Sequence, residues 1–489
     1  MGIIQKQAIS NTVVSIIGIS IGSISQLLMP FILSTDEIGT LAIINSVSTV
    51  IATIFSLGFT QIALRSFSKF KDENNSHSGF LIYGLIVSLI GICLGEFIFY
   101  LFHDLFIGEN EKNKLVQSFS YLIIPIIIFK TIFKNMDIYL RMLLNSVTGA
   151  FLESIVMKLL ILLGLLCFLL NFLDFDQVAL IYMIALSLPG FLILIISFMK
   201  TGKIIFPDKR KFTQKNRIKM MNYGLYGILA SASTIIIISV DQVMLNNMVN
   251  TGAVGIYSVL FFAGMLVSIP ARGIKRISVP ILADAWNRND NENIKEVYNK
   301  SVITMTIFGF YLFIVGWACI HPALTFLDNY ADFVYVFFFI GLAQLLDMMT
   351  GVNMEIIATS SKYKINTYFN FILAILVIFF NYFFIQEWEL VGAASASSLA
   401  MFLVNLFRWN YLRKHFKLQP FNKEFFKVVL IGVVFLLLVS YIEINLNPFL
   451  LIITYGISIT VLYWGIILNL NLSQDINKWI LKLKHRFMG

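Results

Sequence analysis

The sequence predicts an all-α integral membrane protein with about fourteen transmembrane helices, arranged as two pseudo-symmetric six-helix lobes and a two-helix C-terminal appendage. The first observation is composition, because 58% of the 489 residues are hydrophobic and only 13% are charged. The second is that apolar runs of about twenty residues, enough to cross a hydrocarbon core of roughly 30 Å, alternate with short polar segments. The third is a pattern that recurs in both halves. Spanning helices follow, since a backbone in lipid must satisfy its hydrogen bonds within the segment.

The apolar runs place the helices in order along the chain. The first run, from Val13 to Met29, lacks a short apolar core followed by a small-residue cleavage site, so it is expected to span the membrane rather than to be removed. Cys93, Cys167 and Cys319 lie inside apolar runs and indicate neither disulfides nor a metal site. The expected spans are 10–30, 38–64, 79–101, 118–141, 150–172, 178–200, 221–247, 254–275, 300–320, 332–356, 365–385, 391–411, 426–444 and 449–470.

Loop charge predicts the orientation, because basic residues near helix ends stay on the cytoplasmic side. With the N-terminus inside, the loops on that side hold most of the 36 Lys and Arg, and the opposite loops hold only Lys112 and Lys114. Both termini are therefore expected in the cytoplasm. The net charge of +9 is explained by this excess of basic residues in the cytoplasmic loops and by their attraction to anionic lipid of the inner leaflet. No nucleic-acid partner is therefore expected. The main basic cluster is Lys200, Lys203, Lys209, Arg210, Lys211, Lys215, Arg217 and Lys219, and the outer turns carry Asp36, Glu37, Asp174, Asp176, Asp328, Asp332, Glu387 and Glu389.

An internal repeat predicts the domains. Glu37 to Ile44 matches Ala253 to Leu260, with Gly39 opposite Gly255, and further matches follow at nearly the same separation of about 215 residues. Six helices are an even number, so the two halves share one orientation about an axis along the membrane normal. The expected domains are an N-terminal six-helix lobe at 1–200, a basic cytoplasmic linker at 201–219, a C-terminal six-helix lobe at 220–415, and two accessory helices with an interfacial, amphipathic C-terminal helix at 416–489.

Charged residues inside spans need a reason, because an ionisable group at the centre of a spanning helix costs about 2.5–3.5 kcal/mol. In the fourth span the spacings of four, three and four residues place one series on a single helix face: Lys130, Lys134, Asp137 and Arg141. For Lys130, the deepest, lining of a wet central cavity is favoured over a position facing lipid. Arg141 could equally reach the inner surface, where basic side chains near helix ends often lie. The repeat-related face of the tenth span is acidic and carries Gln344, Asp347, Gly351 and Glu355.

Other buried charges are less specific. Glu153 and Lys158 in the fifth span are about 140° apart and need not share a face. Arg272 could serve the cavity or only the loop-charge bias. Asp241 could bind a coupling ion or proton, but a structural role is favoured. The sequence contains no phosphate-binding Gly-x-x-x-x-Gly-Lys-Ser/Thr loop and no soluble domain or long outer loop, so an enzyme is not expected.

Several motifs carry a resemblance to a known family. They are Asp36 to Ile44 (DEIGTLAII), Ser239 to Leu245 (SVDQVML), Ala253 to Tyr257 (AVGIY) and Val391 to Ser397 (VGAASAS). Together they resemble bacterial polysaccharide flippases of the multidrug, oligosaccharidyl-lipid and polysaccharide exporter superfamily. The resemblance implies two six-helix lobes forming a V around a central cavity, in the bacterial inner membrane.

The resemblance also implies a function, the flipping of undecaprenyl-diphosphate-linked oligosaccharide for O-antigen, capsule or other lipopolysaccharide-type assembly. Its partners would be this lipid-linked glycan, membrane lipid, and polysaccharide polymerase and chain-length machinery. The family's cationic cavity is carried over to Lys130, Lys134 and Arg272, with Lys158 and Arg141 behind them. The sequence departs from a purely cationic cavity by its carboxylates, which could orient the basic residues, bind a coupling cation or contact sugar hydroxyls. These carboxylates are Asp137, Asp347, Glu355, Asp241 and Glu153.

Three other functions stay open. An ion-coupled drug or cation exporter of the same fold would have a less basic cavity, and a peptidoglycan-precursor flippase would share the diphosphate. A membrane-embedded polysaccharide polymerase or ligase is the remote third alternative, because it would need a catalytic outer loop. No cofactor is expected, and H+ or Na+ as the coupling ion is left undecided.

Overall fold

The fold is described from a computed structural model, in which residues 3–109, 111–201, 205–208, 210–327, 329–442, 444, 446–473 and 477 are described. All regular structure in these residues is helical. The chain divides into two compact units, Met1–Val259 and Leu260–Gly489, called the N-terminal unit and the C-terminal unit. The interfacial helix expected near the C-terminus falls on residues outside the described ones.

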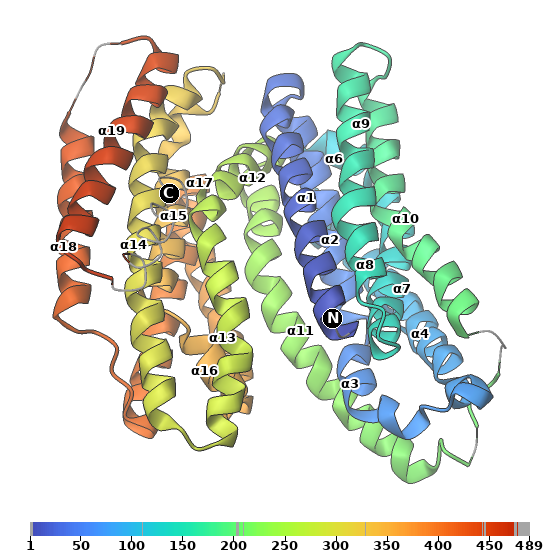
Figure 1. Cartoon of the computed structure of the whole chain (residues 1–489). Coiled ribbons are helices and arrows are strands. Elements are labelled where there is room, and N and C mark those ends of the chain that lie inside the picture. The colour runs from blue at the N-terminus through green and yellow to red at the C-terminus, as the bar shows by residue number, and fades with distance from the viewer. Residues whose placement is uncertain are drawn as a thin grey trace. The chain divides into compact units, whose positions relative to one another are not determined.

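The N-terminal unit is built around α7, which packs against α10, α4 and α2 (Figure 1). A short π-helical segment, Leu152–Val156, joins α8 to α9. The helices of this unit are α1 Ile3–Ile32, α2 Thr35–Ile54, α3 Phe59–Phe70, α4 Phe80–Leu101, α5 His103–Ile107, α6 Lys114–Ser118, α7 Ile123–Met142, α8 Val147–Phe151, α9 Met157–Leu169, α10 Phe175–Thr201 and α11 Gln214–Met248, and α12 Thr251–Met265 begins in it.

The start of α2 shows how the sequence sets a helix end. Ser34 and Glu37 form a capping box, in which each side chain accepts from the other's backbone N–H. Beyond this cap, α2 and α12 approach each other backbone to backbone. A Cβ at Gly39 would lie 1.9 Å from the Thr251 carbonyl oxygen, and a Cβ at Gly255 would lie 1.9 Å from that of Thr35. Glycine is therefore required at both positions of this reciprocal contact.

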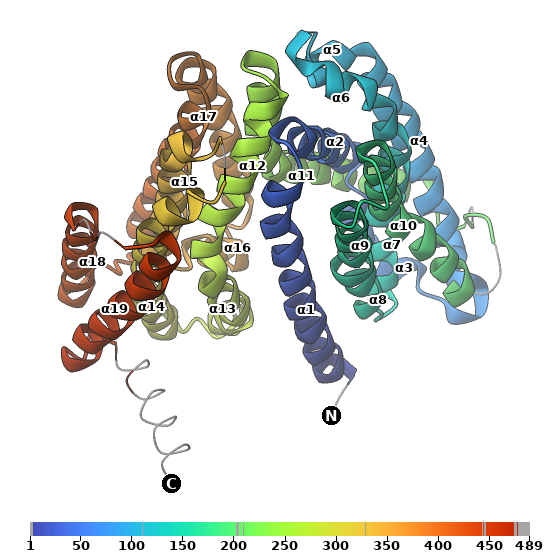
Figure 2. The same cartoon turned by 90° about the horizontal axis from the view of Figure 1, so that it is seen from above.

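The C-terminal unit is centred on α14, which packs against α15, α18 and α19. Its longest helix, α17, reverses at Glu389 (φ 46°, ψ −120°), so it consists of two arms, as the expected spans 365–385 and 391–411 require. Figure 2 shows α17 turning back on itself. The remaining helices are α13 Ile269–Asn287, α14 Asn291–Leu324, α15 Val334–Met349, α16 Asn353–Thr359, α17 Lys364–Phe416, α18 Lys423–Tyr441 and α19 Pro448–Asn469.

Two expected spans are interrupted by residues with positive φ. The expected helix 38–64 ends as α2 and restarts as α3, because Leu57 and Gly58 adopt positive φ. The expected helix 332–356 is divided into α15 and α16 by Gly351, whose φ is +64° and whose Cβ would lie 2.6 Å from Val302. In both places the hydropathy is continuous, and a left-handed residue breaks the helix.

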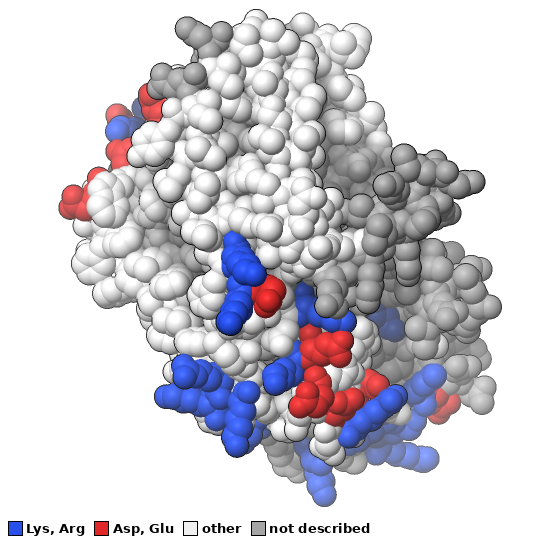
Figure 3. All heavy atoms as spheres, turned by 60° about the vertical axis from the view of Figure 1, so that its left-hand side comes forward, with Lys and Arg blue, Asp and Glu red and all other residues white. Residues whose placement is uncertain are grey.

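The outer surface matches a membrane protein. Eleven helices of the described residues are long and apolar enough to cross a membrane, or 12 if the bent pair Glu111–Ser118 and Ser120–Met142 counts as one span. Figure 3 shows a broad band of uncharged side chains, with the charged ones gathered mainly toward one end. Large apolar side chains on α18 and α19 are exposed, including Leu430, Phe449 and Val461. Such helices contact lipid rather than water.

Candidate functional site

The N-terminal unit contains an open cavity of about 380 Å³, called the N-terminal cavity. Its wall comes from six helices (α2, α3, α7, α9, α10 and α11) and the π-helical segment, with α2 and α7 contributing most of the polar side chains. The lining residues are Asn45, Thr49, Thr53, Ser56, Thr60, Lys130, Phe133, Lys134, Asp137, Ile138, Arg141, Glu153, Met157, Leu186, Pro189 and Ser231.

The charged face of α7 turns into this cavity. Lys130, Lys134, Asp137 and Arg141 all line it, as their spacing along one helix face requires. The other faces of α7 are mainly apolar and pack in the core through Ile126, Ile127 and other buried side chains. The sequence pattern therefore locates the cavity wall, whereas the role of each charge depends on its contacts.

Lys130 is hydrogen-bonded to α2. Its Nζ donates to Asn45 Oδ1 at 2.7 Å and to Thr49 Oγ1 at 2.6 Å. It also lies 3.3 Å from the Asn45 carbonyl oxygen and 3.3 Å from Ser48 Oγ. An ammonium group has three protons, so these four acceptors on one helix saturate it.

Arg141 is paired within its own helix. Its Nη2 lies 2.6 Å from Asp137 Oδ2, an i,i+4 ion pair. The other carboxylate oxygen of Asp137 is buried and has no hydrogen-bond partner among the described residues. Gly149 on α8 makes room for it, since a Cβ there would lie 1.8 Å from Asp137 Oδ1.

Lys134 and Glu153 differ from these three residues. In the described part of the chain neither side chain makes a hydrogen bond or an ion pair, although both line the cavity. Glu153 is exposed and belongs to the π-helical segment Leu152–Val156. A π-helical turn holds one residue more than an α-helical turn and is frequent at functional sites.

Three further predicted residues lie elsewhere. Lys158 Nζ donates to the Gly18 carbonyl oxygen on α1 at 2.9 Å and is not among the cavity-lining residues. Arg272 is exposed on α13, in the C-terminal unit. Asp241 is buried on α11, where Oδ2 accepts from the Tyr257 hydroxyl at 2.6 Å.

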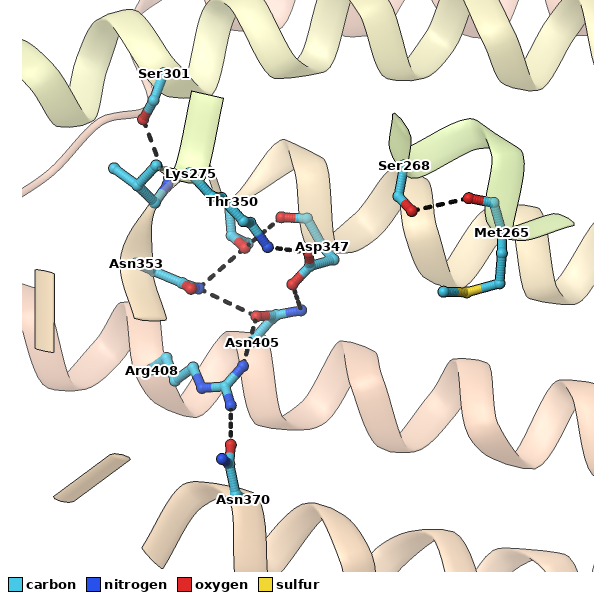
Figure 4. A network of polar contacts seen from close by, with 11 residues as sticks. Met265, Ser268, Lys275, Ser301, Asp347, Thr350, Asn353, Asn370, Asn405 and Arg408 are labelled. Carbon is cyan, nitrogen blue, oxygen red and sulfur yellow. Dashed lines mark hydrogen bonds and ion pairs between the residues drawn. The ribbon is translucent and has the colours of Figure 1, made fainter. Parts of the chain in front are cut away.

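The C-terminal unit holds a second polar cluster, called the Asp347 network (Figure 4). Lys275 Nζ on α13 lies 2.6 Å from Asp347 Oδ2 on α15. Asn405 on the second arm of α17 donates to Asp347 Oδ1 at 3.3 Å, and Arg408 donates to Asn405 at 3.4 Å and to Asn370 on the first arm at 2.6 Å. Both carboxylate oxygens of Asp347 are therefore occupied by protein donors.

Sequence reasoning missed part of this network. Arg408 is only 3% exposed. Its place near the end of the expected span 391–411 would instead assign it to the cytoplasmic loop charges, and the same holds for Lys275 at the end of the expected span 254–275. The available signal was Asn405, a polar residue in the apolar run from Met401 to Phe407, one helical turn before Arg408. Glu355 on α16 lies beyond the helix break, and its Oε2 is buried without a hydrogen-bond partner in the described residues. Gln344 on α15 is half-buried.

The described residues contain no group of three or more His, Cys, Asp or Glu side chains that could hold a metal ion. The chemistry available to the N-terminal cavity is therefore that of lysine, arginine, carboxylate, amide and hydroxyl groups. Such a set can bind and orient a polar ligand.

Comparison with known proteins extends this description. The model of a family described as "Polysaccharide biosynthesis protein" matches residues 4–286. An uncharacterized membrane protein of Methanocaldococcus jannaschii is 21% identical over 295 residues, which cover 57% of this chain and 58% of that protein. The chain thus spans little more than half the length of this relative.

Solved structures share the fold. The inward closed lipid II flippase MurJ superposes with a TM-score of 0.73 at 16% identity, over 95% of this chain and 98% of that chain. An inward-facing multidrug resistance MATE transporter of the MOP superfamily gives 0.66 at 14% identity, over 81% and 94%. A MOP superfamily transporter from Pyrococcus furiosus gives 0.57 at 13% identity, over 84% and 96%. At these identities the likeness concerns the fold alone.

Proposed function

We propose a substrate for this protein from one premise, that the chain belongs to the polysaccharide biosynthesis protein family, whose model matches more than half of it. The fold is that of the MOP superfamily, and the chain is a multi-pass membrane transporter rather than an enzyme. The proposed substrate is an undecaprenyl-diphosphate-linked oligosaccharide. It moves from the cytoplasmic to the periplasmic leaflet for assembly of O-antigen, capsule or a related surface polysaccharide.

The N-terminal cavity is the observation that carries this proposal. Three basic side chains, Lys130, Lys134 and Arg141, line it against two carboxylates, Asp137 and Glu153. A basic excess in a pocket lined by helices favours an anionic group such as a diphosphate. The polyprenyl tail would stay in lipid, where the exposed apolar helices of the chain already lie.

We further infer a membrane arrangement of fourteen spans. The count of 12 includes α17 once, although it has two arms, and does not include α11, of which the side chains at 230 and 232–238 lie outside the described residues. Both termini would then be cytoplasmic in a bacterial inner membrane. The lobes 1–200 and 220–415, the linker 201–219 and the appendage 416–489 stay predictions.

Transport would follow alternating access. A ligand shifts two conformations only through its differential affinity for them, so the cavity must bind the diphosphate more tightly in one state. A substrate gradient or a coupling ion, H+ or Na+, would supply the direction. A polymerase and the chain-length machinery would receive the flipped unit.

Peptidoglycan-precursor flipping is a second candidate, favoured by the TM-score of 0.73 with the lipid II flippase. Export of cationic drugs is a third candidate function, and the carboxylates of the cavity wall favour it. Growth without MurJ would support the second, and sensitisation of a deletion strain to cationic dyes with unchanged surface glycan would support the third.

The test of the proposed function is complementation of a strain that lacks its polysaccharide flippase. Lys130→Ala combined with Lys134→Ala should abolish surface polysaccharide while membrane levels of the protein stay normal. Lys362→Ala, an exposed lysine outside the cavity, is the matched control and should complement fully. Normal surface polysaccharide in the double variant would refute the cationic-cavity proposal.

A further inference from the structure

We infer that the N-terminal cavity recognises the phosphosugar junction of its substrate, with Lys134 binding the phosphate next to the first sugar and Glu153 accepting hydrogen bonds from that sugar. This inference rests on the proposed function and specifies which part of the substrate the cavity binds. It follows from four observations on how the lining groups are already used.

The first observation is that three of the five cavity charges already have a partner within the protein. Lys130 is saturated by acceptors of α2, and Arg141 and Asp137 neutralise each other at 2.6 Å. A ligand gains little from Lys130, because the hydrogen-bonding capacity of its ammonium is already filled. Lys130 is therefore a positioning residue that ties α7 to α2, and it adds positive potential without a free donor.

The second observation is that Lys134 keeps its donors. In the described part of the chain its ammonium has no hydrogen bond and no ion pair, and it faces the cavity. An ammonium binds phosphate oxygens as a compact point charge with three donors. One such lysine suits one phosphate group rather than a whole diphosphate.

The third observation concerns the hydroxyl groups of the wall. Thr53 Oγ1 donates to the Thr49 carbonyl oxygen at 2.6 Å, and Ser56 Oγ donates to that of Thr53 at 2.8 Å. Thr49 Oγ1 likewise donates to the Asn45 carbonyl oxygen. A hydroxyl has a single proton, so these groups offer the cavity only their lone pairs. These three hydroxyls therefore suit a ligand that donates hydrogen bonds, and phosphate at neutral pH has few donors.

The fourth observation is the carboxylate of Glu153, which is exposed to the cavity and attracted electrostatically by Lys134, but makes no hydrogen bond or ion pair among the described residues. Beside a bare diphosphate it would only repel. Beside a sugar it accepts hydroxyl or amide hydrogens in charge-assisted bonds, while Phe133 offers an apolar surface to the ring. One lysine, one carboxylate and a row of acceptors together match a sugar attached to phosphate.

The test measures binding of two probes to the full-length protein in nanodiscs: undecaprenyl diphosphate, and the same lipid carrying one N-acetylhexosamine. The wild type should bind the glycosylated lipid about tenfold more tightly. Glu153→Ala should lose this preference and bind the bare lipid at least as well as before, and Glu153→Gln should keep part of it because its amide oxygen still accepts. Lys134→Ala should weaken the binding of both probes about tenfold. Glu387→Ala removes an exposed carboxylate outside the cavity and should change the binding of neither probe.

The outcomes separate the two proposals. If the wild type binds neither probe, the proposed function fails. If it binds both equally, or if Glu153→Ala keeps the preference for sugar, this inference is overturned while the proposed function stands. If Glu153→Ala loses both probes together with a sodium dependence seen in the wild type, the carboxylate serves a cation, which also overturns the inference.

Discussion

Replacing Gly39 with alanine should force α2 away from the start of α12 and destabilise the N-terminal unit. The new methyl carbon would lie 1.9 Å from the Thr251 carbonyl oxygen, whereas real contacts of this kind stay above 3.0 Å, so the two backbones must part by roughly 1 Å. Neither atom is the end of a flexible side chain. Overpacking of this type costs about 1–3 kcal/mol.

Gly255→Ala should cost a similar amount, because its methyl would lie 1.9 Å from the Thr35 carbonyl oxygen in the same contact. Once one methyl has separated the helices, the second has room. The double variant should therefore lose about 1 kcal/mol less than the sum of the single losses. Additive losses would show that the two clashes relax independently, which contradicts the reasoning.

The assay is reversible denaturation of the purified protein in mixed detergent micelles, with tryptophan fluorescence as the signal. Gly456→Ala is the matched control, since a Cβ at this position would have no neighbour within 4 Å, and its unfolding free energy should stay within about 0.5 kcal/mol of the wild type. A Gly39→Ala protein as stable as this control would refute the close approach.

Three other predictions follow from the charged groups. Lys130→Met should lower the unfolding free energy by about 1–3 kcal/mol, because it leaves Asn45 Oδ1 without its donor, whereas Lys134→Met should stay within about 0.5 kcal/mol, as thermal unfolding can show. Lys275→Ala should cost about 3 kcal/mol by leaving Asp347 buried without its cation, and adding Asp347→Ala should restore part of the loss in the same denaturation assay. Binding of undecaprenyl diphosphate should weaken as salt rises from 0.1 M to 1 M, because the screening length falls from about 10 Å to 3 Å, and titration at both salt concentrations checks this.

The sequence predicts the membrane fold and the charged face of α7 well, for a physical reason. Hydropathy and helical spacing are local properties, and a face with Lys130, Lys134, Asp137 and Arg141 can lie next to lipid only at high cost. Any fold that buries this helix must turn that face toward a polar interior. The structure does so.

The helix break at Gly351 could not be predicted in the same way. The apolar run continues through it, and only the positive φ of one residue, packed against Val302, shows that the helix stops. The different roles of the two cavity lysines could not be predicted from the sequence either. Lys130 and Lys134 are one turn apart and look alike in the sequence, yet the acceptors that saturate Lys130 come from Asn45, Ser48 and Thr49, more than eighty residues away.

Loop-charge counting also has a limit that Arg408 illustrates. The rule assigns a basic residue near a helix end to the cytoplasmic surface, and it ignores the partners that a neighbouring helix can bring. Asn370 and Asn405 supply such partners from both arms of α17. A charge near a helix end can thus be a core residue when the reversal at Glu389 places amides beside it.

The reciprocal contact of α2 with α12 has a consequence for the predicted internal repeat. Thr35 of α2 contacts Gly255 of α12, and Thr251 of α12 contacts Gly39 of α2. In both helices the threonine precedes the glycine by the same number of residues. This is the pattern of a two-fold subunit interface, in which each patch meets its own copy. In a homodimer of half-length chains, every charge would have appeared twice. Under the predicted repeat, a single chain is free of that constraint and can carry a lysine-bearing α7 in one half and an aspartate-bearing α15 in the other.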